Sequence, residues 1–424
     1  MDPLRSPGSS DHGGAGRSTS PHEQATGAGA SRRWTRADTA RTALALAVAV
    51  ALLGGAAALH GSAAHGADAG FSLLLGAALG IVCERGRFCF YCIFRDLFED
   101  RNSHGAYAVL TALAVGALGY TVVLAMFVPD PSSGTLPPGA HIGPVTWTTL
   151  VAAIAFGLGV VLSGGCIGGH LYRLGEGSVR ALPALAGAAV GFGLGFASWN
   201  PLYLAGLSSA PSPWLPQLFG YGGSLALTLA VLAVAAVALL RRLPDRAARS
   251  ASPVTLAEVG RTVFARRWPP LLTGATVGII VVVAYLRVEP LGVTRQLGSA
   301  TRTVLDGTGL LPATLHGLDG FAGCATVVAE VVLANGWLIL GVVAGSFAAA
   351  LPGRRFRIER LTGSGTVSAV MGGLLLGWGA MTAIGCTFGV LLSGVSAFAL
   401  SGWVFAAGLL LALWAGFRLG LHRN

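Results

Sequence analysis

The chain has 424 residues, of which 53% are hydrophobic and only 11% charged, and its mean hydropathy is +0.68. Soluble domains carry roughly 25% charged residues, so this composition excludes an ordinary soluble protein and indicates a polytopic membrane protein. The net charge of +10 comes entirely from arginine, since the sequence has no lysine. These arginines fall between apolar segments and do not gather with aromatic residues, so we expect no nucleic-acid partner.

The amino-terminal segment 1–40 is polar and rich in serine and glycine, and it is too long and too charged for a cleavable signal. We interpret it as a disordered cytoplasmic tail. Ten apolar segments follow, each near the roughly 20 residues that cross a bilayer. They lie at about 41–59, 70–87, 106–128, 146–163, 179–199, 224–240, 270–286, 331–351, 367–384 and 398–417. The sequence therefore predicts an all-α integral membrane protein with about ten transmembrane helices.

Two shorter apolar stretches, 88–98 and 310–328, are candidate half-helices. Two glycine-framed turns interrupt longer apolar runs: Gly165-Cys166-Ile167-Gly168 and Gly385-Cys386-Thr387-Phe388-Gly389. Broken backbone at membrane depth is tolerated only where it is packed in protein or lines a cavity. We therefore expect both turns to be re-entrant and to border a substrate path.

The arginines set the expected orientation. Groups of them precede the first apolar segment and follow the second, fourth, sixth and eighth, which places both termini and these loops in the cytoplasm. The two cysteine turns then point in opposite directions across the membrane, as in an inverted-topology repeat. A weaker correspondence pairs Arg87-Phe88-Cys89 with Thr294-Arg295-Gln296. The expected organisation is the tail at 1–40, a first transmembrane helix and outer loop at 41–69, a first transporter repeat at 70–199, a linking helix and basic cytoplasmic loop at 200–268, a second repeat at 269–417, and a cytoplasmic carboxyl terminus at 418–424.

The six cysteines lie in or beside apolar segments, which favours free thiols over a secreted disulfide framework. Cys166 and Cys386 are either small buried hydrophobes or polarizable thiols that line a path. Cys89 and Cys92 form a C-x-x-C pair without a second ligand pair, so neither a metal nor another cofactor is expected. Cys324, near His316 and Asp319, is a candidate for a secondary role on the path.

Several polar residues in the same stretches have two interpretations. Arg87 and its charged neighbours, Glu84, Arg85, Arg95 and Asp96, either form interfacial pairs or attract an anion at the mouth of a pore. His170 either caps the backbone or contacts a substrate. The equivalent position of the second turn is the apolar Val390, so the two turns differ chemically.

With these motifs in view, residues 70–417 resemble the YeeE/YedE family of sulfur-compound transporters. The resemblance rests on RGRFCFYCIFRDLF, on SGGCIGGHLYRLGEG, on AIGCTFGVLLSGVSAFALSGW and on Leu291-Gly292-Val293-Thr294. It implies an hourglass-like inverted-repeat protein that imports thiosulfate across the bacterial plasma membrane past cysteine thiols. It also implies that any acceptor of the imported sulfur is a separate cytoplasmic sulfur-carrier protein. The residues expected on the path are Cys89, Cys166, Cys386, Gly165, Gly168, Gly385, His170 and Arg87.

Two other interpretations stay open at this stage. A membrane enzyme that handles sulfane sulfur through a cysteine persulfide would use the same cysteines, and a selenium compound would suit the same soft ligands. A transporter is the leading interpretation, and no catalytic residue is assigned.

Overall fold

The computed structural model describes residues 35–62, 66–240, 267–312, 314–321, 326–329 and 331–423. Most of the expected tail, the basic loop at 241–266 and Cys324 lie outside these described residues. The chain divides into two compact units, Met1–Ala40 and Arg41–Asn424. In the first unit, the backbone amide and hydroxyl of Thr35 donate to the Asp38 carboxylate at 2.9 and 2.6 Å, where helix α1 begins at Arg36. The segment expected to be disordered therefore ends in helix.

The regular elements of the described residues are helical, as the sequence predicted, and each of the ten apolar segments coincides with one helix. Nine helical spans among these residues have the length and hydropathy to cross a membrane, and α12, with 17 residues, is slightly shorter. The ten helices are α1 (Arg36–His60), α2 (Gly66–Gly86), α4 (His104–Phe127), α5 (Trp147–Ser163), α7 (Ala181–Leu202), α8 (Leu215–Leu240), α10 (Pro270–Arg287), α12 (Ala334–Ala350), α13 (Gly363–Thr382) and α14 (Leu400–Arg418).

The shorter helical elements correct part of the prediction. The half-helix expected at 88–98 is confirmed as α3 (Phe90–Phe98), and α6 (Ile167–Gly175) and η5 (Thr387–Gly394) follow the two cysteine turns. The half-helix expected at 310–328 is wrong, because the described part of that stretch contains only the single turn η4 (Leu318–Gly320). The corresponding short helix is instead the polar α11 (Val293–Leu305).

Glycines let the long helices touch backbone to backbone. In α2, a Cβ added at Gly76 or Gly80 would collide with carbonyl oxygens of α12, and Gly341 and Gly345 of α12 face α2 in the same way. The pair α7 and α13 repeats the arrangement with glycines four residues apart on each helix: Gly187, Gly191, Gly373 and Gly377. Small residues at this spacing allow close approach of membrane helices, which accounts for the high glycine content.

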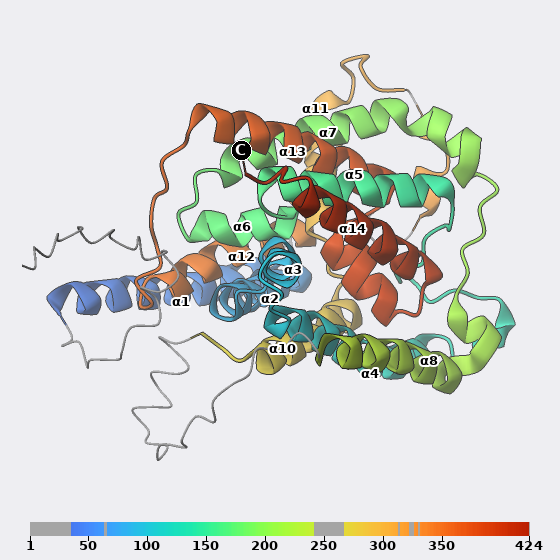
Figure 1. The fold of residues 1–424 in the computed structure, drawn as a ribbon, viewed down its shortest axis with the longest axis horizontal. Helices are drawn as coiled ribbons and strands as arrows, with labels where there is room; N and C mark the ends of the chain where they lie inside the picture. The colour runs from blue at the N-terminus through green and yellow to red at the C-terminus, as the bar shows by residue number, and fades with distance from the viewer. Residues whose placement is uncertain are drawn as a thin grey trace, which may run out of the picture. The chain divides into compact units, whose positions relative to one another are not determined.

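The helix contacts of the second unit come in matched pairs. Helix α2 packs on α12 as α10 packs on α4, and α7 packs on α13 as α14 packs on α5. The short elements follow the same rule: α6 contacts α7 and α12, while η5 contacts α14 and α4. In Figure 1, α6 runs between the group containing α5, α7 and α13 and the group containing α2 and α12. An inverted repeat produces such paired contacts, and the short elements occupy its middle.

Candidate functional site

Four short helical elements begin near one another in the middle of the second unit. Cys89 is the N-cap of α3, Cys166 the N-cap of α6, and Cys386 the N-cap of η5, while Gly292 precedes α11. Helix α11 contacts both α6 and η5. Helix N-termini carry unpaired amides and partial positive charge, so their convergence favours a small anion.

The thiols of Cys89 and Cys166 both lie beside Gly169. The Cys166 Sγ accepts a hydrogen bond from the Gly169 amide at 3.3 Å. A Cβ placed on Gly169 would lie 3.5 Å from the Cys166 Sγ and 3.6 Å from the Cys89 Sγ. Cys89, Cys166 and Cys386 are each at most 1% exposed, and every described cysteine is a free thiol. The free thiols expected from the sequence are thus confirmed for these residues.

Two threonine hydroxyls lie beside the central thiols. Thr387 is next to the Cys166 thiol and Thr294 is next to the Cys386 thiol. Both hydroxyl oxygens are buried and neither has a hydrogen-bond partner within normal geometry. A buried hydroxyl left unpaired costs about 1–3 kcal/mol. The centre therefore holds neutral S–H and O–H groups that lie against one another.

An aromatic cluster separates the two cysteine turns. The ring of Phe388 lies 6.5 Å from that of Phe88 and 6.2 Å from that of Phe90, measured between centroids. A Cβ on Gly168 would lie only 2.5 Å from the Phe388 Cε2. Gly168 is thus needed for the close approach of the Phe388 ring, which occupies the second-turn position equivalent to Gly168 itself.

The first turn is braced by hydrogen bonds within the protein. The Ser163 hydroxyl contacts the Gly165 carbonyl at 2.9 Å and the His170 Nε2 at 3.0 Å. The His170 ring also lies against Gly165, whose missing Cβ makes room for it. Of the two interpretations of His170, this geometry favours support of the turn over direct contact with the central space.

The second turn keeps an unusual backbone. Its Ile384 has φ of +55° and Gly385 has φ of +154°, while the matching position of the first turn is Gly164 at +85°. A β-branched residue in the left-handed region is strained by about 1–3 kcal/mol and needs surrounding structure to hold it. The second turn therefore stores strain at the step before Cys386 that the first turn avoids.

A polar cavity of about 410 Å³ opens on one side of the centre. Six arginines that come from separate stretches of the chain line it: Arg87, Arg173, Arg180, Arg267, Arg355 and Arg357. Glu176 also lines it, and burial, aided by nearby Glu84 and opposed by Arg173, Arg267 and Arg355, raises the pKa of its carboxyl to about 7. The arginine-bearing loops thus meet on one side, and their cavity attracts anions.

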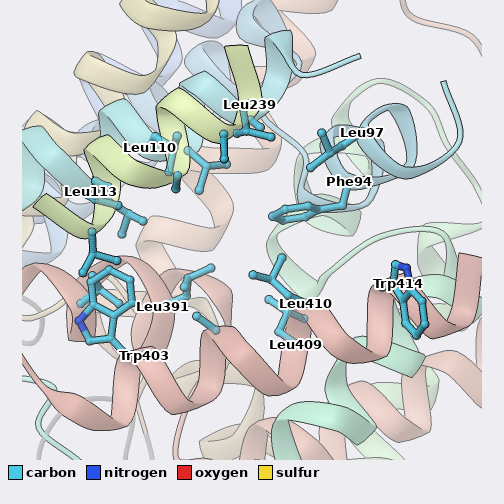
Figure 2. A pocket seen from close by; sticks show the side chains of 18 of the residues that line it. Phe94, Leu97, Leu110, Leu113, Leu239, Leu391, Trp403, Leu409, Leu410 and Trp414 are labelled. Atoms are coloured by element: carbon cyan, nitrogen blue, oxygen red, sulfur yellow. The ribbon is translucent and has the colours of Figure 1, made fainter. Parts of the chain in front are cut away.

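A second cavity has the opposite chemistry. Figure 2 shows Phe94 and Leu97 of α3, Leu110 of α4, and Leu410 and Trp414 of α14 around a space of about 600 Å³. Its walls are apolar and aromatic side chains, so it gives a charged solute no compensation for lost hydration. This groove is not a path for an anion.

Charged residues around the polar cavity are mostly paired. Arg173 donates to the Gly164 carbonyl at 2.6 Å and approaches the Cys92 Sγ at 2.8 Å, joining α6 to α3 and the first turn. The side chain of Glu84 is fully buried and pairs with Arg355 and Arg85. The pair expected between Arg95 and Asp96 is confirmed at 3.0 Å.

Arg87 is ion-paired and also lies at the polar cavity. It lines the polar cavity, and its guanidinium lies 3.7 Å from the Asp96 carboxylate. Its backbone has φ of +51°, at the break between α2 and α3. Arg87 therefore lines the polar cavity just before Cys89 begins α3.

The structure brings together Cys89, Cys166, Gly165, Gly168 and His170 around the first turn, and Phe388 connects them to the turn of Gly385 and Cys386. Sequence reasoning missed Thr387, Gly169 and the role of Phe388, although all three lie inside the motifs that it singled out. It also paired Arg87-Phe88-Cys89 with Thr294-Arg295-Gln296. The structure changes that pairing. Cys89 is the N-cap of α3, and the residue in the same position of α11 is Gly292.

The chain is similar in sequence to several known proteins. The chain is 28% identical to the thiosulfate transporter TsuA of Escherichia coli K12 over 81% of its own length and 92% of the relative. It is also 28% identical to the thiosulfate transporter TsuA of Spirochaeta thermophila, over 81% of this chain and 96% of that one. The probable transporter YedE of E. coli K12 matches at 30% identity over 45% of each chain. A family model described as sulphur transport matches residues 85–415. Because this match covers most of the chain, the protein belongs to the sulphur-transport family, the YeeE/YedE family that its motifs resemble.

Proposed function

We propose that this protein imports thiosulfate, or a related sulfur-containing anion, across the bacterial plasma membrane along a path lined by Cys89, Cys166 and Cys386. Family membership supports transport of a sulfur compound, and the names of two relatives suggest thiosulfate. The observation that carries the proposal is the placement of all three thiols at the starts of short helices, where each is buried.

The chemistry of the centre suits passage better than storage. Thiols are weak donors and polarizable acceptors, which match a soft sulfur atom. Helix N-termini supply partial positive charge without a fixed cation. Several weak contacts in series let an ion enter and also leave, as conduction requires.

The orientation of the protein in the membrane is inferred from the arginine cavity. Cytoplasmic loops carry the excess of arginine in membrane proteins, so we place the cavity, and both termini, on the cytoplasmic side. An anion leaving the thiols then enters a positively charged space before release. A separate cytoplasmic sulfur-carrier protein would collect it there.

Uptake of radiolabelled thiosulfate into proteoliposomes tests the proposal. We expect the intact protein to transport, and Cys166→Ala and Cys386→Ala to lose uptake while inserting normally. Cys83→Ala is the matched control, since Cys83 is also buried but lies within the continuous helix α2. Normal uptake by both path variants would contradict a thiol-lined path, and no uptake by the intact protein would point to another sulfur or selenium anion.

One contact favours the persulfide enzyme as a second candidate. The Cys92 Sγ lies 2.8 Å from an Arg173 nitrogen, and activated cysteines are found beside cations. A thiolate that attacks the sulfane sulfur of thiosulfate would form a persulfide and release sulfite with the electron pair of the broken S–S bond. Mass spectrometry of the protein after incubation with thiosulfate decides between the two, since a transporter gains no sulfur atom on Cys92.

A further inference from the structure

Two cysteines share the first turn of α3, and one of them, Cys92, has no place on the path proposed above. Cys89 is the N-cap residue and has an extended backbone, and Cys92 follows it by three residues. Residues at this spacing are neighbours on one face of a helix. The two thiols are hydrogen-bond partners of each other. The C-x-x-C pair of the sequence is therefore a close dithiol in the structure.

The surroundings of the two sulfur atoms differ. Cys92 is among the described residues that line the polar cavity of about 410 Å³, and Cys89 is not. Cys89 is fully buried, and its Sγ would lie 3.6 Å from a Cβ placed on Gly169 of the first turn. A small solute in the cavity can therefore meet Cys92 first, and Cys89 lies behind it as a second thiol.

A fixed cation lies beside the cavity-facing thiol. One nitrogen of Arg173 is 2.8 Å from the Cys92 Sγ, and another donates to the Gly164 carbonyl at 2.6 Å. A neighbouring guanidinium stabilises the thiolate, which is the reactive form of cysteine. Redox-sensing cysteines combine thiolate character and access to solvent with a second thiol close enough to resolve the oxidised sulfur. The Cys92 site has all three properties.

We propose that Cys89 and Cys92 are a redox-sensitive dithiol, which hydrogen peroxide in the polar cavity oxidises to a disulfide that stops transport. First, the Cys92 thiolate attacks one peroxide oxygen: an S–O bond forms, the O–O bond breaks, and the released hydroxide takes up the proton that Cys92 had lost. The Cys89 sulfur then attacks the Cys92 sulfenic acid: the S–S bond forms, the S–O bond breaks, and the hydroxide leaves as water with the Cys89 proton. The two thiols lose two electrons, and the peroxide is reduced to two water molecules.

The effect on transport rests on the proposed function, in which Cys89 is one of the path thiols. A disulfide removes the S–H donor of Cys89 and turns its sulfur toward Cys92. The path then lacks the thiol that lies beside Gly169 and Cys166. Disulfides of cytosolic proteins are usually transient and redox-sensing, so thiol reductants should restore the path.

Mass spectrometry tests the disulfide without any measurement of transport. The purified, reduced full chain is treated with hydrogen peroxide, and its remaining thiols are then blocked with N-ethylmaleimide. The peptide that contains Cys89 and Cys92 should lose two hydrogen atoms and take up no label. In Cys92→Ser, whose hydroxyl can still accept from Arg173, Cys89 should stay free and take up the label.

Uptake into proteoliposomes tests the effect on transport. Peroxide should lower thiosulfate uptake by the intact protein about tenfold, because a hydrogen-bond donor to a charged ligand is lost, and dithiothreitol should restore it. Uptake by Cys92→Ser should be the same before and after peroxide. Cys83→Ala is the matched control: Cys83 is also buried but lies within α2, so this variant should lose uptake as the intact protein does.

Each outcome decides one part of the inference. Free thiols at both positions after peroxide, or an equal loss of uptake in Cys92→Ser, would overturn the redox-sensitive dithiol. Full uptake by protein whose mass shows the disulfide would overturn its control of transport. If the reduced, intact protein takes up no thiosulfate, the proposed function fails, and the mass measurement still decides whether the disulfide forms. Should Cys92→Ser fail to insert, Cys92→Ala replaces it with the same expected results.

Discussion

Gly169 provides a direct test of whether Cys89 and Cys166 share one path. A methyl group at this position would lie 3.5 and 3.6 Å from the two sulfur atoms, which are ordinary contact distances. Alanine is also favoured over glycine in helices by about 0.5–1 kcal/mol. Gly169→Ala is therefore expected to fold with unchanged or slightly higher stability. The new methyl group, however, lies against both thiols.

The expected effect on transport follows from the contacts that the methyl group removes. A hydrogen bond to a charged ligand contributes about 1.5–3 kcal/mol, so losing one such contact reduces binding by a factor of about 10 or more. Radiolabelled thiosulfate uptake by Gly169→Ala should fall accordingly. Thermal unfolding in detergent, measured on the same preparation, should show no loss of stability.

Gly168→Ala is the matched neighbour in the same helix. Its Cβ would lie 2.5 and 2.8 Å from two carbon atoms of the Phe388 ring, and overpacking of this kind costs about 1–3 kcal/mol. This variant should lose stability as well as uptake, and Phe388→Leu in the same chain should restore part of the stability. Wild-type uptake by a stable Gly169→Ala protein would refute the shared path, whatever Gly168→Ala does.

Two further predictions concern the arginine cavity. Arg355→Met leaves the fully buried Glu84 with Arg85 alone, so the free energy of unfolding should fall by about 3–5 kcal/mol. The double variant Glu84→Gln/Arg355→Met should recover most of this loss. Equal stability of the intact protein, the single variant and the double variant would contradict a structural ion pair. Glu176, faced by Glu84, Arg173, Arg267 and Arg355, has a pKa raised to about 7, mainly by burial. Its charge appears as pH rises through 7 and weakens the positive potential, so uptake should fall over that interval and Glu176→Gln should flatten the profile. The raised pKa also means that stability declines as pH rises from about 4.5 toward 7, which melting curves of the two proteins can check.

Much of the architecture follows from the sequence by simple physics. Ten apolar segments gave ten helices, because a bilayer requires apolar side chains over a fixed length. The cysteine turns were visible because glycine interrupts a helix where membrane segments otherwise avoid interruption. Arginine positions also identified the loops that meet at one cavity, since membrane orientation controls them.

The short helix α11 shows why the rest was harder to predict. One face of α11 is polar, and its polar groups bond to a neighbouring segment of backbone. The Gln296 Oε1 accepts from the Leu333 amide at 3.0 Å, and the Thr303 hydroxyl accepts from the Ala329 amide at 3.1 Å. Hydropathy cannot reveal a helix whose polar groups bond to neighbouring backbone, so the sequence predicts a short helix in the apolar stretch 310–328 and not at α11.

The separation of charge from the centre has a physical reason. An arginine paired directly with a divalent anion in a dry interior would bind it strongly and slow its departure. Of the six cavity arginines, Arg173 is held by the Gly164 carbonyl and lies beside the Cys92 thiol, while the groups next to the Cys166 and Cys386 thiols are the Thr387 and Thr294 hydroxyls. Attraction from the cavity and weak contacts at the thiols then act at different points along the path. An anion can therefore be drawn through the protein without being trapped in its middle.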